Sequence, residues 1–273
     1  MRQFKLLVSL MVFVADGVFG TLGRVFGLRR PARCVVLFYH SVMDDQREGF
    51  ARQMDTVLRH ARVVNPATPA PLERGANYVA ITFDDANANI IANALPTLRQ
   101  RGIPAMIFVI SDRLGVIPDW ENFGPDYTPE ERTITAEQLR ALPADGLHFG
   151  SHTRTHPVLT KLDESRAREE LVNSRRELEA LLGRDIQAFS FPYGAYNERL
   201  IQLCREAGYE RVFTTDPVFA FQRKDDFVVG RVAAEPTDGG LEFRLKVAGA
   251  YRWVKAASDL KQKLRGLLAG ASA

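Results

Sequence analysis

Two short stretches of the chain carry side chains that could act together in a hydrolytic reaction. The stretch AITFDDA ends an apolar, β-rich run on the adjacent carboxylates Asp84 and Asp85, and the later stretch GSHTRTH holds His152 and His156 as an i, i+4 pair. Histidine pairs of this spacing are common, and most bind no metal. Burial of two adjacent carboxylates, however, is costly without a cation, and a divalent metal stabilises both. The two stretches together therefore predict a metal site with one carboxylate to spare.

Two histidines and one carboxylate with an open position form the ligand set of many hydrolytic zinc sites. A metal held in this way lowers the pKa of a bound water to about 7, and an unligated carboxylate beside it can remove the proton. We therefore expect a divalent metal, with Zn²⁺ favoured, and expect Asp84 and Asp85 to supply both a base and a ligand. The same ligands also accept Co²⁺, Ni²⁺ or Mn²⁺, so the sequence leaves the metal's identity open.

The elements that must position these side chains follow from the hydrophobic pattern. Short apolar, β-branched runs predict strands, and the amphipathic segments between them predict helices. The expected strands are 34–39, 78–83, 104–110, 147–151, 187–191, 210–214 and 227–232. The expected helices are 46–64, 87–101, 136–142, 162–182 and 197–207. This alternation of strand and helix predicts a parallel α/β sheet, open or closed.

The polar residues at the strand ends favour a closed barrel. His40, Asp84, His152 and Tyr193 each fall at or just past the carboxyl end of a different expected strand. Barrel active sites gather at that end, whereas an open sheet would bring fewer strands to one spot. We therefore expect a barrel with its site at the carboxyl rim.

Length and composition fit one globular domain. A chain of 273 residues with 46% hydrophobic content can bury a large core and belongs to the size class of α/β barrels. The formal net charge of +3 is small, and basic residues do not interleave with aromatic ones, so a nucleic-acid-binding protein is excluded.

An insertion over 115–133, rich in proline, glycine and aromatic residues, could cover the site. Its Trp120 is a candidate for stacking on a sugar.

Four stretches, in order along the chain, resemble the motifs of a known family. TFDDA resembles the motif TFDDG of the polysaccharide deacetylases, carbohydrate esterase family 4 or the NodB homology domain, with Ala86 for the usual glycine. SHTRTH and FSFPYG are similar to the second and third motifs, and LFYH is also found in many relatives. The resemblance covers about Cys34 to Arg231 and implies a distorted (β/α)7 barrel.

The resemblance implies a role for each matched residue. Asp84 would be the general base, and Asp85, His152 and His156 would hold the metal. Tyr193 would give a backbone N–H to the oxyanion, a donor whose loss costs other enzymes about 10² to 10³ in rate. The implied reaction hydrolyses a non-peptide carbon–nitrogen bond. It removes the N-acetyl group of an amino sugar in a polysaccharide, an oligosaccharide or a lipid-linked glycan, and releases acetate.

Two departures from the family pattern bear on the mechanism. Ser190 stands where the third motif usually carries an arginine that braces the base, and Arg231 is the substitute as well as a candidate substrate contact. The family's late general-acid histidine has no counterpart, because no histidine follows His156. His40 is the candidate general acid. Alternatively, it contacts the site residues without taking part in the reaction, or it packs in the core. Since one acid typically contributes about 10² to 10⁴ in rate, we expect a slower enzyme rather than an inactive one.

Two alternative functions follow from the same residues. One is a deformylase or amidase that uses the same chemistry on a polyprenyl-linked sugar. The other is a catalytically inactive carbohydrate-binding relative, suggested by Ser190 and the missing late histidine. The presence of Asp84, which metal binding alone does not need, argues against the second.

The two ends of the chain differ from its middle. We divide the chain into an apolar and basic helix at 1–33, the barrel at 34–240 and a basic amphipathic helix at 241–273. The first is expected to anchor on a membrane, with a signal peptide and a core helix as alternatives. The second is expected to pack on the barrel, with membrane-surface binding as the alternative. These features predict inner-membrane association, with peripheral contact through both termini and a glycan or glycolipid substrate. A cytoplasmic or an exported protein is the alternative.

Overall fold

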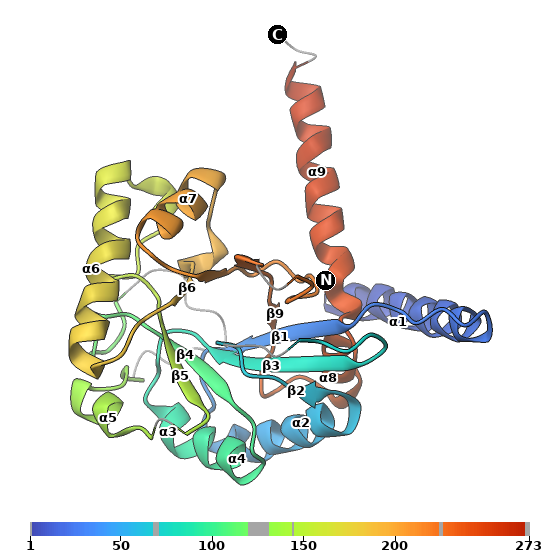
Figure 1. Ribbon diagram of the computed structural model, residues 1–273, viewed down its shortest axis with the longest axis horizontal. Coiled ribbons are helices and arrows are strands. Elements are labelled where there is room, and N and C mark those ends of the chain that lie inside the picture. The colour runs from blue at the N-terminus through green and yellow to red at the C-terminus, as the bar shows by residue number, and fades with distance from the viewer. Residues whose placement is uncertain (1, 68–70, 120–130, 144, 224–225, 271–273) are drawn as a thin grey trace.

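The structure, a computed structural model, describes residues 2–67, 71–119, 131–143, 145–223 and 226–270. Its centre is a curled sheet of parallel strands with helices around the outside (Figure 1). The strands are β1 (Arg33–Tyr39), β2 (Arg62–Val63), β3 (Asn77–Phe83), β4 (Ala105–Val109), β5 (Leu147–Ser151), β6 (Ala188–Ser190), β7 (Arg211–Phe213), β8 (Val228–Val229) and β9 (Val232–Ala233). The helices are α1 (Arg2–Val25), α2 (Arg47–His60), α3 (Asn89–Asn93), α4 (Leu95–Gln100), α5 (Ala136–Ala141), α6 (Glu164–Leu182), α7 (Glu198–Glu206), α8 (Gly240–Val247) and α9 (Trp253–Gly270). Two 3₁₀ turns also matter below, η3 (Pro192–Gly194) and η4 (Ala250–Arg252).

The order of the strands makes this sheet a barrel. Hydrogen-bonded neighbours run β8-β7-β6-β5-β4-β3-β1-β9, all in parallel, and β2 pairs with β3 outside that path. The two end strands, β8 and β9, are separated in the chain only by Gly230 and Arg231. The sheet must therefore curl until its edges meet at this link. The expected single-domain barrel is confirmed.

Burial along β1 shows how the barrel is filled. Val35, Leu37 and Tyr39 belong to the large apolar core that the helices cover, whereas Cys34 and Val36 belong to a smaller cluster. Successive side chains of a strand point to opposite faces, so both faces of β1 are buried. The smaller cluster also contains Ala80, Met106, Phe108, Ala188 and Phe213. The interior of the barrel is a packed core, and the site has to lie at its rim.

Two of the expected helices differ from the hydrophobic pattern, one by ending early and one by being split in two. The helix expected at 46–64 stops at His60, and the next residues form β2 beside β3. The helix expected at 87–101 is two helices, α3 and α4. The break lies where Pro96, in the first turn of α4, lacks the N–H that a continuous helix would need.

Glycines divide two further segments that were each expected as one element. The strand expected at 227–232 is both β8 and β9, because the chain crosses between the two edges of the sheet at Gly230. A Cβ on Gly230 would lie 2.3 Å from the carbonyl oxygen of Asp216. The helix expected at 241–273 breaks between α8 and α9, where Gly249 has a φ of 71°. Because α8 packs on α2 and β1, that part of the C-terminal segment belongs to the barrel.

Candidate active site

The residues predicted to act together meet at one rim of the barrel. Asp84 and Asp85 directly follow β3, His40 follows β1, and His152 follows β5, with His156 in the loop beyond it. Parallel strands end at the same edge of a sheet, so these side chains come from neighbouring strand ends. All of them except His40, which is half-buried, are buried.

Asp85, His152 and His156 form a candidate metal centre. Oδ1 of Asp85 lies 3.4 Å from Nε2 of His152 and 3.4 Å from Nε2 of His156, longer than an ordinary N–H···O hydrogen bond. This oxygen has no hydrogen-bond partner among the described residues, although it is buried. The ligand atoms of a tetrahedral ion with bonds of about 2.1 Å lie about 3.4 Å apart. The donor atoms therefore fit one metal ion, and the three residues are those that the sequence predicted as ligands.

The two histidines present nitrogen atoms suited to a metal. Nδ1 of His152 lies 2.8 Å from the carbonyl oxygen of Ser190, so an N–H at Nδ1 can donate there and leave Nε2 as the ligand. Burial lowers the pKa of His156 to about 4 against the charge of Asp85, which keeps this ring neutral near pH 7. Burial also lowers the pKa of His152. The carboxylates of Asp84 and Asp85 together raise it by more, so the pKa of this ring lies above its usual value.

Asp84 lies beside the candidate metal ligands and is held by Arg231. Nη1 of Arg231 donates to Oδ1 of Asp84 at 2.7 Å, and Nη2 donates to Oδ2 at 2.8 Å, a two-point ion pair. The guanidinium also donates to the hydroxyl oxygens of Ser190 at 2.7 Å and Thr82 at 3.2 Å. Burial raises the pKa of Asp84, but the charge and hydrogen bonds of Arg231, together with the nearby histidines, outweigh burial, and the pKa lies below its usual value. The carboxylate is therefore ionised.

Arg231 reaches Asp84 from the link between β8 and β9, where the edges of the sheet meet. It supplies the charge that Ser190 cannot, and Ser190 accepts one of its hydrogen bonds. The sequence also proposed Arg231 as a substrate contact. Its side chain has no exposed surface, however, and its guanidinium lies over the ring of Phe38 at 4.6 Å. This burial corrects the substrate-contact expectation, because the side chain instead holds Asp84 from within the barrel.

Strained backbone is concentrated at the site. Among the described residues, six other than glycine have positive φ, and five of these are Asp85, Ala86, Thr153, His156 and Tyr193. Such conformations are unfavourable for residues with a Cβ and persist where the surroundings enforce them. Ala86, at a φ of 54°, stands where the family motif usually has glycine. The turns after β3 and β5 thus aim the ligands at the cost of local strain.

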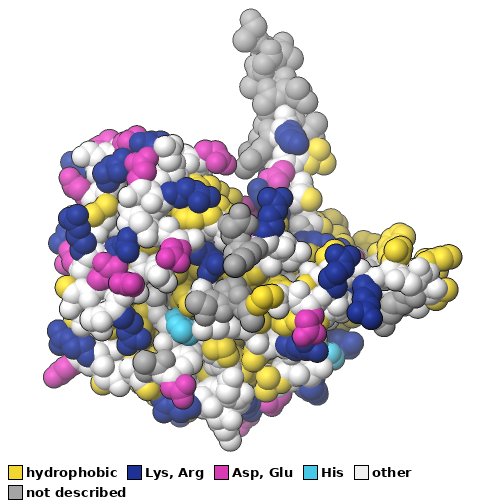
Figure 2. Space-filling model, viewed as in Figure 1, with side chains coloured by type: hydrophobic (Ala, Val, Ile, Leu, Met, Phe, Trp, Pro, Cys, Tyr) yellow, Lys and Arg dark blue, Asp and Glu magenta, His cyan; other side chains and the backbone are white. Residues whose placement is uncertain are grey.

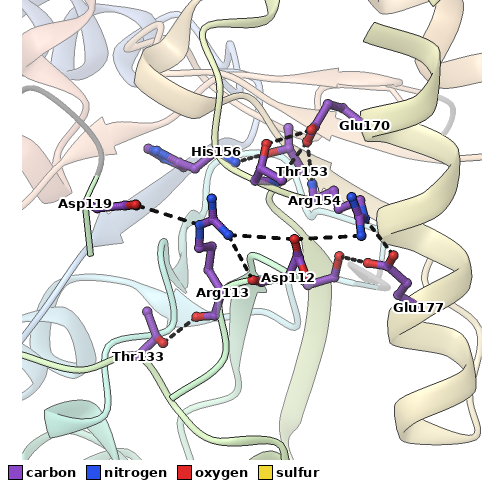
Figure 3. A network of polar contacts seen from close by, with 11 residues as sticks. Asp112, Arg113, Asp119, Thr133, Thr153, Arg154, His156, Glu170 and Glu177 are labelled. Carbon is purple, nitrogen blue, oxygen red and sulfur yellow. Dashed lines mark hydrogen bonds and ion pairs between the residues drawn. The ribbon is translucent and has the colours of Figure 1, made fainter. Parts of the chain in front are cut away.

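The loop that carries His156 is fixed by α6 (Figure 3). The carboxylate of Glu170 accepts hydrogen bonds from the backbone N–H groups of Arg154 at 2.8 Å and Thr155 at 2.9 Å, and from the Thr155 hydroxyl at 2.7 Å. The hydroxyl of Thr153 accepts the backbone N–H of His156 at 2.9 Å. Sequence reasoning missed Glu170. The only signal was an acidic residue on the helix that follows the HxxxH motif.

The structure places two of the remaining predicted residues, Tyr193 and His40, near the site, and it does not describe the third, Trp120. Tyr193 is 39% exposed and packs against His156, with 4.7 Å between the ring centroids. His40 packs edge-to-face against Phe38. It lies close enough to both aspartates that a positive charge on its ring lowers the pKa of each. Trp120 lies outside the described residues, so its predicted contact with a sugar has no structural test.

A family model described as polysaccharide deacetylase matches residues 72–212, just over half of the chain. The chain belongs to the polysaccharide deacetylase family. The matched segment contains the candidate metal ligands and Asp84, and it ends before Arg231. Members of this family hydrolyse non-peptide carbon–nitrogen bonds, which is the reaction class that the sequence predicted.

Three relatives illustrate the similarity. The Bacillus subtilis protein YxkH, a polysaccharide deacetylase by name, is 25% identical over 236 residues, which cover 81% of this chain and 77% of that protein. The poly-beta-1,6-N-acetyl-D-glucosamine N-deacetylase of Staphylococcus aureus is 25% identical over 163 residues, which cover 56% of this chain and 53% of that enzyme. The structure of IcaB from Ammonifex degensii is 26% identical, with a TM-score of 0.65 over 81% of this chain and 98% of that one.

Proposed function

We propose that this polysaccharide deacetylase removes N-acetyl groups from a polymer of an N-acetylated amino sugar and depends on a divalent metal, with Zn²⁺ favoured. The observation that carries the proposal is the buried Asp85 oxygen that faces two imidazole nitrogens at 3.4 Å, beside a second ionised carboxylate. The similarity to a staphylococcal N-acetylglucosamine polymer deacetylase supports this substrate class.

Each group of residues at the site has a separate role in the proposed reaction. A metal bound by Asp85, His152 and His156 would polarise the amide and acidify a water near neutral pH. Asp84, held ionised by Arg231, accepts the proton that the attacking water loses. As the amide C–N bond breaks, the leaving nitrogen needs a proton, and the position of His40 at the end of β1 supports it as the donor.

Tyr193 is the candidate donor to the oxyanion. Its positive φ of 59° turns the backbone of η3 at the rim, next to His156. A backbone N–H aimed at the developing negative charge lowers the barrier without any rearrangement of the protein during the reaction. The half-exposed Tyr193 ring stands at the edge of the metal centre, where a sugar would enter.

Acetate release tests the proposal. Purified protein with Zn²⁺ is incubated with β-1,6-linked N-acetylglucosamine oligomers, and Asp84→Asn is compared with the exposed control Asp145→Asn. We expect Asp84→Asn to lower the rate by about 10² to 10⁴, and Asp145→Asn to leave it unchanged. Equal background rates in the wild type and Asp84→Asn would rule out the proposed reaction. An N-formylated oligomer run in parallel distinguishes a deformylase.

A further inference from the structure

Helix α1 has two apolar sides, and the barrel covers one of them. Leu6, Leu10 and Phe13 pack against the apolar core. The buried hydroxyl of Ser9 accepts a hydrogen bond from Nε1 of Trp253 at 2.9 Å. Residues at these spacings lie on one face of a helix, and this face fastens α1 to η4 and α8.

Ion pairs hold the same face of α1 at two points. Nε of Arg2 lies 2.9 Å from Oε2 of Glu242 in α8. The carboxylate of Asp16 is paired with Arg33 at 2.9 Å and with Arg252 at 2.7 Å. Cleavage of α1 would take away the carboxylate that faces both of these arginines. The contacts therefore favour α1 as a permanent part of the folded protein over a signal sequence.

The opposite side of α1, its uncovered face, is apolar and exposed. Figure 2 shows hydrophobic side chains along the projecting helix. By length and composition alone, Arg2–Gly23 is able to cross a membrane. Soluble proteins rarely leave a long apolar stripe exposed unless something binds it. The uncovered face consists of Leu7, Met11, Val14, Val18, Leu22 and Val25, each at least 50% exposed.

Basic side chains border the uncovered face. Lys5 lies exposed near its start, and Arg29 lies exposed just beyond its end. The exposed Arg74 donates a hydrogen bond to the carbonyl oxygen of Arg29 at 2.8 Å, which places a further positive charge there. This border complements an anionic surface. A second copy of the chain would bring its own basic border against this one, and the like charges would repel.

The ion pairs of Asp16 favour a helix that lies on the bilayer surface over one that spans the bilayer. Asp16 lies within α1 on the covered face, together with its two arginine partners. A spanning helix would carry these charges into the hydrocarbon or separate them, and both are costly. A helix on the surface keeps the contacts with the barrel and immerses only the uncovered face.

We propose that the uncovered face of α1 binds an anionic phospholipid bilayer and lies in its headgroup region. Figure 1 shows α1 continuing past the point at which β1 begins, so its projecting half lies at the amino end of the sheet. The catalytic residues lie at the carboxyl ends of the strands. The site therefore lies at the opposite end of the strands from the projecting half of α1, where a glycan in the aqueous phase can reach it. This last step rests on the proposed function, whereas the binding itself does not.

Vesicle flotation of the full chain tests the proposal. Vesicles of phosphatidylcholine with phosphatidylglycerol are compared with vesicles of phosphatidylcholine alone. We expect the wild type to float mainly with the anionic vesicles, and expect Met11→Gln/Val18→Gln to lower the bound fraction about tenfold or more. Glutamine is a good helix former, so α1 should persist. The matched control Leu58→Gln, at an exposed leucine of α2, should bind as the wild type does.

Two results would overturn the proposal. One is equal flotation of the double variant and the wild type. The other is a wild type that is dimeric in light scattering without vesicles and a double variant that is monomeric, because the face would then bind a second copy. Acetate release from a soluble acetylated oligomer should be the same in both proteins. That measurement separates a failure of membrane binding from a failure of the proposed function.

Discussion

Asp84 and Asp85 are adjacent in the chain, yet their carboxylates have different partners. Asp85, at a φ of 64°, faces His152 and His156, whereas Asp84 faces Arg231. Two neighbouring carboxylates that shared one environment would raise each other's pKa. Separate positive partners would let one carboxylate serve as a metal ligand and the other as a base.

The arginine behind Asp84 can be tested with a conservative change. Arg231→Lys keeps the charge but loses the two-point contact with Asp84. We expect kcat to fall by about 10², because the base is misplaced, with KM and the affinity for Zn²⁺ little changed. Steady-state kinetics and metal titration measure these quantities.

Arg175→Lys, at a partly buried arginine on α6 that pairs with Glu179 and with the carbonyl oxygen of Ala207, is the control and should retain wild-type kcat. A fall in kcat and Zn²⁺ affinity by the same factor in Arg231→Lys would point to general unfolding instead.

At the scale of elements, the site depends on how α6 meets the loop after β5. The strained Thr153 and His156 lie in that loop, and Glu170 satisfies two of its backbone N–H groups. A carboxylate that accepts several hydrogen bonds holds a loop more firmly than the loop's own contacts would. Glu170 is therefore a positioning residue for the candidate ligand His156.

Replacement of Glu170 should weaken metal binding without unfolding the protein. In Glu170→Gln, the neutral amide oxygen can still accept from the backbone N–H groups of Arg154 and Thr155, but these hydrogen bonds lose the strength that the negative charge gave them, so the loop loosens. We expect the dissociation constant for Zn²⁺ to rise about 10- to 100-fold. Competition with a chelating dye gives this constant.

Glu169→Gln, the neighbouring exposed glutamate on α6, should match the wild type. Amide hydrogen exchange at Arg154 and Thr155 should become faster only in Glu170→Gln. Unchanged exchange there would contradict the positioning role, whatever the activity.

The elements also show what local pattern can and cannot predict. Apolar runs that end in polar motifs were enough to place β1, β3 and β5 and the residues that follow them. The breaks at Pro96 and Gly249 had a local signal that periodicity outweighed. Glu170 had no signal that set it apart from its neighbours, because several acidic residues lie along α6 and only the folded loop shows which of them it meets.

At the scale of the whole molecule, a metal would join two strand ends of the barrel. Asp85 follows β3, whereas His152 and His156 follow β5, with β4 between these strands. A ligand that binds only the folded state stabilises it in proportion to its occupancy. Metal binding should therefore strengthen the rim as well as complete the site.

Thermal unfolding measures this coupling. With free Zn²⁺ at about 100 times its dissociation constant, we expect about 2.7 kcal/mol of stabilisation. That corresponds to a rise in Tm of about 5 to 10 °C for a chain of this size. Asp85→Asn should lose most of the rise, whereas Asp145→Asn should keep it. An equal rise in Asp85→Asn and the wild type would place the stabilising ion elsewhere.

The ion pair between Arg231 and Asp84 joins residues that no local pattern connects. The family match ends at residue 212, and the arginine lies beyond it, in the link that closes the barrel. The family motif usually has an arginine at the position of Ser190, whereas here the arginine that reaches Asp84 stands in the link between β8 and β9. We therefore expect positions 190 and 231 to covary among relatives, with arginine at one or the other. A survey that scores each motif separately would count such enzymes as defective.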